Sequence, residues 1–276
     1  MGIRCRFEND LSFDTRRFLK ICHATFAVVF LVLIVGNAEV LAVSRAASLS
    51  PLEKGLMLSP KVALYGARGP SFSEIKNARF TMLGTEVWSD CDWPILTKWI
   101  KSVHAQGLRA FTVVGIEKVA LTTMIDLVKK SASAGTDVMV LDEVLARYQF
   151  NEGQLRSILD AGLQANPKLE FILDEYLENT ITNAYLWTAK YPSARIATDD
   201  YYNKGTIDLG IQLAAAYKKS PLVWLIFVPD GSQDFDTLRN FDAWVAYVKA
   251  RNVMTFFWFI DSKGNWQTQW TKVVAF

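Results

Sequence analysis

Histidine and cysteine are scarce in this chain, and their scarcity excludes several kinds of catalytic site. The sequence holds 2 histidines and 3 cysteines in 276 residues. Metallohydrolase barrels with histidine ligands, zinc proteases and Ser-His-Asp hydrolases all need imidazoles that are absent or not suitably placed here. His104 lies in a helical pattern that favours a structural role, and Cys91 has no neighbouring histidine to activate it as a nucleophile.

Blocks of one charge sign and cofactor motifs are also missing. The 30 basic and 28 acidic residues alternate along the chain and leave a net charge of +2, so nucleic acid is a poor candidate partner. The glycines make neither a G-x-G-x-x-G turn nor a phosphate-binding P-loop. We therefore expect no bound cofactor and no dedicated metal site.

The N-terminus has a composition of its own and resembles a secretory signal peptide. An apolar run over residues 24–35 follows five basic residues and precedes small ones. This run is shorter than the ~20 residues that span a bilayer, which favours a cleaved signal peptide over residues 1–42. The alternative is a retained N-terminal anchor, which would be the chain's one contact with a membrane. Both readings predict a secreted or otherwise extracytoplasmic protein.

The rest of the chain has the rhythm of a parallel α/β fold. We expect a linker over residues 43–60 and one domain over residues 61–276, in which short apolar runs alternate with helical patterns. The expected helices include 95–106, 124–134 and 152–165, each followed by a residue type that ends helices. The expected strands are Val62–Gly66, Phe80–Trp88, Leu108–Val114, Asp137–Leu141, Leu169–Leu173, Ala194–Thr198, Leu222–Val228 and Val253–Ile260.

Eight such strands predict a compact (β/α)8 barrel, the TIM-barrel architecture. The first crossover, over residues 67–79, is short for a full helix, so a seven-stranded arrangement with the first strand outside stays open. A doubly wound open sheet is the second alternative, although its usual glycine-rich turn is missing.

Acidic residues recur where the expected strands end, which is where barrel enzymes carry their active sites. Some of them, such as Asp230 and Asp261, are explained as helix caps. The sequence Leu-Asp-Glu, however, occurs twice directly after an apolar strand. The carboxylates at these strand ends are Glu86, Asp142, Glu143, Asp174, Glu175, Asp199, Asp200, Asp230 and Asp261.

Two carboxylates across a barrel mouth suit the hydrolysis of a glycosidic bond. One carboxyl group protonates the leaving oxygen, and the other attacks the sugar or activates water. Our catalytic candidates are Asp142, Glu143, Glu175 and Asp199. The substrate-binding candidates, which add aromatic faces for sugar rings, are Glu86, Trp88, Asp174, Asp200, Tyr201 and Trp258.

Several stretches of the first half of the domain resemble a known family. They are Val62-Ala63-Leu64-Tyr65-Gly66, residues 107–115 and residues 134–143, which ends in Leu-Asp-Glu. They resemble the secreted endo-α-1,4-polygalactosaminidases and the related spherulation-specific family 4 proteins. The resemblance implies a small barrel in which Asp142 is the catalytic residue of the fourth strand and Glu143 completes the pair. It implies a second carboxylate on a later strand, for which Glu175 and Asp199 are the candidates.

Three functions follow from these observations. The leading hypothesis is a glycosidase that acts on a polysaccharide, with Asp142 as nucleophile or base and Glu175 or Asp199 as proton donor. The second is a catalytically inactive barrel that binds glycans or a surface partner. The third is an enzyme that holds a divalent cation with carboxylates alone.

Overall fold

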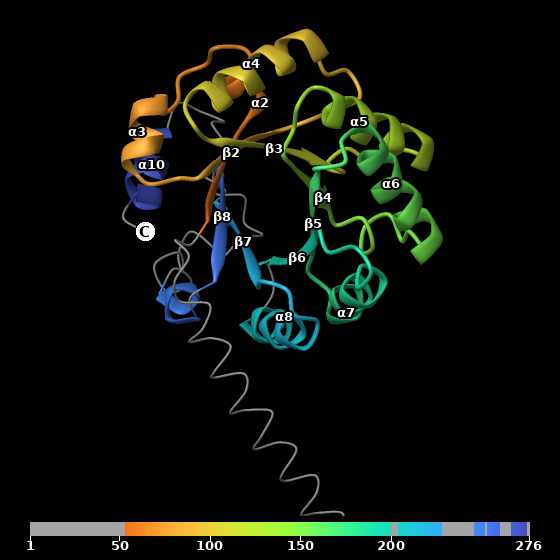
Figure 1. The fold of residues 1–276 in the computed structure, drawn as a ribbon. Coiled ribbons are helices and arrows are strands. Elements are labelled where there is room, and N and C mark those ends of the chain that lie inside the picture. The colour runs from red at the N-terminus through yellow and green to blue at the C-terminus, as the bar shows by residue number, and fades with distance from the viewer. Residues whose placement is uncertain (1–52, 200–203, 228–245, 252, 260–265, 275–276) are drawn as a thin grey trace, which may run out of the picture. The chain divides into compact units, whose positions relative to one another are not determined.

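Eight parallel strands close into a barrel, and helices surround it (Figure 1). The computed structural model describes residues 53–199, 204–227, 246–251, 253–259 and 266–274, all within the compact unit of residues 50–276. The strands are β1 (Lys54–Leu58), β2 (Met82–Glu86), β3 (Arg109–Val114), β4 (Val138–Asp142), β5 (Glu170–Glu175), β6 (Ala194–Asp199), β7 (Leu222–Phe227) and β8 (Met254–Phe259). Each strand pairs with the next along the chain, and β8 pairs with β1. The predicted (β/α)8 architecture is confirmed.

Helices follow the strands on the outside of the barrel. They are α2 (Pro60–Ala63), α3 (Phe72–Asn77), α4 (Trp93–Ala105), α5 (Leu121–Ser133), α6 (Glu152–Ala165), α7 (Glu178–Trp187), α8 (Lys204–Ala216) and α10 (Trp266–Val274). The expected stop signals act as predicted after α4 and α5, because Gly107 and Gly135 adopt the left-handed conformation with φ of 74° and 102°. In the described part of the chain, no helix is long and apolar enough to cross a bilayer.

The first strand lies elsewhere than we expected. The predicted strand Val62–Gly66 is wrong, because residues 60–63 form helix α2, and residues 54–58 of the expected linker form β1. The reason is Pro60, which sits at the first position of α2, where its fixed φ suits a helix and its missing N–H leaves no hydrogen bond unmade. The barrel therefore starts before Ser59, and it closes with β1 as a full member.

Side chains fill the barrel interior, so the barrel is a packed core and not a pore. The interior cluster holds Met57, Met82, Phe111, Val113, Val138, Val140, Ile172, Ala197 and Leu222. Gly84 makes room for the largest of them, because a Cβ atom at that position would lie 2.2 Å from the Phe111 ring. A larger apolar cluster packs the outer faces of the strands against the helices.

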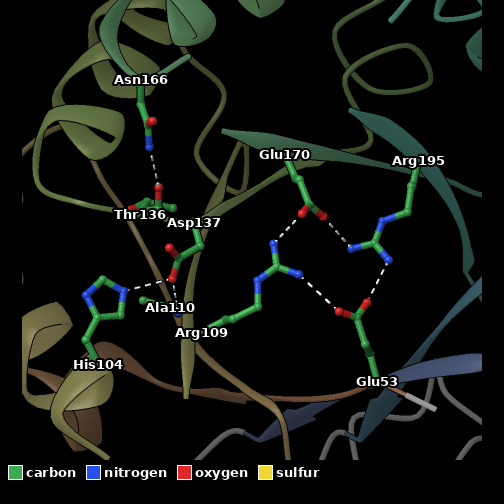
Figure 2. A network of polar contacts seen from close by, with 9 residues as sticks. All are labelled: Glu53, His104, Arg109, Ala110, Thr136, Asp137, Asn166, Glu170 and Arg195. Atoms are coloured by element: carbon green, nitrogen blue, oxygen red, sulfur yellow. Dashed lines mark hydrogen bonds and ion pairs between the residues drawn. The ribbon is translucent and has the colours of Figure 1, made fainter. Parts of the chain in front are cut away.

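A closed ring of four charged side chains lies at the N-terminal ends of the strands (Figure 2). Arg109 contacts Glu53 at 3.0 Å and Glu170 at 2.7 Å, and Arg195 contacts the same two carboxylates at 2.9 and 3.0 Å. Arg109, Glu170 and Arg195 each lie two residues before an interior residue of their strand, so alternation points them inward. The ring thus closes the end of the barrel opposite to the expected site.

His104 lies in the same region and has a structural role, as we expected. Its Nε2 atom is 2.8 Å from Oδ2 of Asp137, and that oxygen also accepts the backbone N–H of Ala110 at 2.7 Å (Figure 2). These contacts tie the end of α4 to the start of β4.

Candidate functional site

Three carboxylates occupy inward positions at the C-terminal ends of their strands. Glu86 ends β2, Asp142 ends β4, and Asp174 is the penultimate residue of β5. Each lies an even number of residues after an interior side chain of its strand, so alternation directs it into the barrel mouth. Their exposed fractions are 8%, 5% and 0% respectively, so these carboxyl groups are largely shielded from water.

Asp142 has a strongly raised pKa. Burial raises its pKa to about 7, and the neighbouring negative charges of Glu143 and Glu86 act in the same direction. The guanidinium of Arg147 opposes them but does not offset them. Asp142 therefore holds a proton through most of the acid range, which is the state that a general acid needs.

Glu86 lies two strands away from Asp142, on β2, and its negative charge acts on the Asp142 carboxyl group. Burial raises its pKa, while a hydrogen bond from the Trp88 indole, Nε1 to Oε2 at 3.2 Å, lowers it in part. This bond also orients Trp88, whose side chain stays 38% exposed. The two residues thus present an acid group and an accessible aromatic surface side by side.

Glu143 and Arg147 form an ion pair above the end of β4. The backbone of Glu143 is left-handed, with φ of 49°, and its N–H donates to the carbonyl of Asp174 at 2.8 Å. Arg147 places Nη2 at 2.6 Å from Oε2 of Glu143 and Nη1 at 3.3 Å from Oδ2 of Asp142. Sequence reasoning missed Arg147, although its spacing of four residues from Glu143 was a visible signal.

The turn after β3 packs against the end of β4. Gly115 has φ of 111°, and a Cβ atom there would lie 2.8 Å from the Asp142 carbonyl oxygen. The Tyr148 hydroxyl donates to the Gly115 carbonyl at 2.7 Å, and Arg147 donates to the Ile116 carbonyl at 3.2 Å. Only glycine fits this close approach of the β3 turn to the Asp142 backbone.

Glu175 is placed differently from the role we expected for it. Its side chain is fully buried, and its two oxygens accept the backbone N–H groups of Leu145 and Ala146 at 2.7 and 3.1 Å. Burial raises its pKa to about 8 in spite of these hydrogen bonds. A carboxyl group with no exposed surface and both oxygens engaged by a loop does not meet a substrate, so the expected role as proton donor does not fit this geometry.

Four of the expected site residues lie wholly or partly outside the described residues. Asp200 and Tyr201 lie outside the described residues, as do the side chains of Asp199 and Trp258. The backbone of Asp199 ends β6 and pairs with Trp224, and Trp258 belongs to β8 and pairs with Met57.

The remaining reactive groups give no second site. Burial, followed by the charges of Asp92 and Asp90, raises the pKa of the Cys91 thiol to about 11, which leaves it unreactive at neutral pH. Within the described residues, no three His, Cys, Asp or Glu side chains lie close enough together to hold a metal ion.

Comparisons with known proteins identify the fold and no family. No protein-family model and no curated protein sequence matches this chain. Among solved structures, the N-acetylneuraminate lyase of Proteus mirabilis is similar with a TM-score of 0.51 at 8% identity, over 82% of this chain and 79% of that one. The GH53 glycoside hydrolase catalytic domain of Ignisphaera aggregans is similar with a TM-score of 0.50 at 14% identity, over 78% and 82%. Both likenesses extend to the barrel fold alone.

Proposed function

We propose that this protein is a glycoside hydrolase that uses Asp142 as the proton donor and Glu86 as the second carboxylate. The observation that carries the proposal is the acidity of Asp142, an inward carboxyl group at a strand end whose pKa is about 7. Glu86 is another inward carboxyl group at this end of the barrel, its charge acts on Asp142, and two interacting carboxyl groups can divide the acid and base roles between them. The resemblance to secreted polysaccharide hydrolases in the sequence points to the same chemistry.

In this mechanism the protonated Asp142 donates its proton to the glycosidic oxygen as the bond to the anomeric carbon breaks. The ionised Glu86 either attacks that carbon or takes a proton from the attacking water. These roles differ from those expected from the sequence, in which Asp142 was the nucleophile or base, Glu175 or Asp199 was the proton donor, and Glu86 bound the substrate. The proton-donor role passes from Glu175 to Asp142, because Glu175 is enclosed beneath the loop.

The charges around the mouth support a polysaccharide that carries amino groups. Glu86 and Glu143 are negative when ionised, whereas Asp142 is the protonated member and Asp174 has no exposed surface. Arg147 contacts Asp142 and Glu143. Ionised carboxylates at the mouth attract cationic sugars and repel uronic acids. The exposed Trp88 ring offers a flat apolar face beside Glu86, suited to the face of a sugar ring.

Lyase chemistry through a lysine Schiff base is less well supported by the strand residues. Such a mechanism needs a lysine amine at the reacting carbonyl group. The strands contain a single lysine, Lys54, which begins β1 and therefore lies at the end of the barrel away from Asp142. The similarity to a lyase of the same fold consequently adds no catalytic group of that kind.

The test is an assay of the full chain for release of reducing ends from neutral, acidic and amino-sugar polysaccharides. We expect Asp142→Asn and Glu86→Gln each to lower kcat/KM by at least about a hundredfold, the usual contribution of acid–base catalysis. The control is Asp126→Asn, which removes a carboxylate paired with Lys130 on the surface of α5 and should keep full activity.

Three outcomes would change the conclusion. Equal activity in all three variants would exclude the two-carboxylate mechanism. Loss in Asp142→Asn alone would keep the proton donor and move the second carboxylate away from Glu86. A wild-type chain that binds a polymer without cleaving it would favour the catalytically inactive glycan-binding barrel.

A further inference from the structure

Glu175 holds together a turn that the proposed reaction depends on. Asp174 and Glu175 are neighbours at the end of β5, and alternation sends Asp174 inward and Glu175 outward, beneath the segment that follows β4. There the two Glu175 oxygens accept the N–H groups of Leu145 and Ala146. These two N–H groups lie within a single turn of residues 143–147, in which the Arg147 N–H donates to the Glu143 carbonyl at 2.7 Å.

The turn leads directly to the cation that contacts Asp142. Arg147 follows Ala146, and its guanidinium bridges the carboxylates of Asp142 and Glu143. The start of the turn is fixed independently, because the Glu143 N–H donates to the Asp174 carbonyl. The Arg147 guanidinium is also held by the Ile116 carbonyl and by Glu143, so loss of the Glu175 contacts should weaken its contact with Asp142 and not abolish it, while Glu143 stays in place.

We propose that Glu175 is a positioning residue, which acts through the 143–147 turn to keep Arg147 on the Asp142 carboxyl group. This proposal rests on the proposed function and adds to it the residue that holds in place the cation that lowers the pKa of the proton donor. Glu175 itself touches no substrate. It serves as the acceptor for the buried N–H of Leu145 and the partly buried N–H of Ala146, and loss of a buried hydrogen bond is costly in a protein interior.

The proposal predicts a direction for the pKa of Asp142. Arg147 lowers this pKa, whereas Glu143 raises it. A variant that frees Arg147 and leaves Glu143 in place should raise the pKa of Asp142 by about 1 pH unit, the low end of the effect of a nearby opposite charge. A purely structural role of Glu175 would lower stability and leave this pKa unchanged.

The test is a carbon-13 NMR titration of the Asp142 carboxyl group in the full chain, labelled at aspartate, which needs no substrate. The variant Glu175→Gln keeps the shape of the side chain but replaces one acceptor with an NH2 group that faces the amide of Ala146. We expect Glu175→Gln and Arg147→Met both to raise the pKa of Asp142, with the larger rise in Arg147→Met. The double variant should raise it no further than Arg147→Met alone, because both changes act on the same contact.

The matched control is Tyr185→Phe, which also removes a buried hydrogen bond, the one to the Gly210 carbonyl between α7 and α8. It should leave the pKa of Asp142 as in the wild type. The proposal is overturned if Arg147→Met moves this pKa and Glu175→Gln does not. An inactive wild-type chain with the expected titration would contradict the proposed hydrolase and leave the positioning role intact.

Should Glu175→Gln fail to melt cooperatively, the wild-type chain still decides the question. Ionisation of Glu175 near pH 8 should shift the amide resonances of Leu145 and Ala146 and produce a second inflection in the Asp142 signal. The charge of Glu143 also acts on Glu175 and on Asp142. The second inflection must therefore persist in Glu143→Gln, which lacks that charge. Its absence in the wild-type chain would overturn the proposal.

Discussion

Glu53 and Arg195 are 142 residues apart in the sequence, yet Oε2 of the first lies 2.9 Å from Nη1 of the second. Glu53 precedes β1, the strand that closes the barrel against β8, and Arg195 lies in β6. Arg109 and Glu170 complete the ring, so each carboxylate contacts two guanidinium groups. The ring joins the segment before β1 to three strands, β3, β5 and β6 (Figure 2).

We expect Glu53→Gln to lower the free energy of unfolding by about 1–2 kcal/mol, because partly exposed ion pairs contribute modestly. The change also leaves the positive charges of Arg109 and Arg195 with one carboxylate fewer between them. Urea denaturation of the full chain measures this. Glu152→Gln, which removes an exposed pair with Arg156 on α6, is the control and should cost less than about 0.5 kcal/mol. Equal losses in the two variants would show that the ring adds nothing beyond a surface pair.

The ring also predicts a pH dependence of stability. Burial alone would raise the pKa of Glu53, but the hydrogen bond and charge of Arg195, followed by those of Arg109, bring it below its ordinary value of 4.5. Since the folded-state pKa is lowered, the stabilisation is present above pH 4.5 and disappears as the pH falls through the folded-state pKa. The difference in unfolding free energy between wild type and Glu53→Gln should therefore shrink below pH 4.5.

At the other end of the barrel, the raised pKa of Asp142 predicts the opposite pH dependence of stability. Its pKa is raised from 3.8 to about 7, so the folded chain binds a proton more tightly than the unfolded chain, and stability falls as the pH rises from about 4 to 7. We expect Asp142→Asn to stabilise the chain at pH 8 relative to wild type, by up to about 4 kcal/mol. Unfolding in urea at pH 4 and pH 8 measures this, and a gain of the same size at both values would contradict it.

The pH dependence of activity should be bell-shaped. The proposed reaction needs a protonated Asp142 and an ionised Glu86, so kcat/KM should fall as the pH rises above about 7 and fall again on the acid side, where Glu86 takes up its proton. The acid limb should lie above the range of an ordinary glutamate, because burial raises the pKa of Glu86. An activity that keeps rising above pH 8 would exclude Asp142 as the proton donor.

Gly84 offers a test of the packing inside the barrel. The added methyl group of Gly84→Ala would overlap the Phe111 ring, and we expect a loss of about 1–3 kcal/mol in the free energy of unfolding. A second change, Phe111→Leu, should restore part of it by removing the ring. Gly153→Ala, in the first turn of α6, is the control and should be neutral or stabilising, because its Cβ would meet no atom closer than 3.4 Å.

Much of the fold could be predicted because barrel strands are covered on both faces and read as apolar runs. Every strand from β2 to β8 overlaps a run that we had identified, from Met82–Glu86 onward. The strand β1 could not be found in this way, because Lys54 and Gly55 dilute its apolar character and Val62–Gly66 offered a stronger run nearby. Whether Lys54–Leu58 is a strand depends on its hydrogen bonds to β2 and β8, and these are tertiary contacts.

By itself, the sequence determined the fold class and the clustering of acidic residues at one end of the barrel, since the order of strands and helices places every strand end on the same side. Tertiary structure alone decided which member of each Asp-Glu pair faces the mouth. Alternation points Asp142 and Asp174 inward, and a register shift of one residue would have exchanged them for Glu143 and Glu175. Burial then set the acidity of Asp142 and enclosed Glu175, because the solvation of a carboxyl group depends on residues that are distant in the chain.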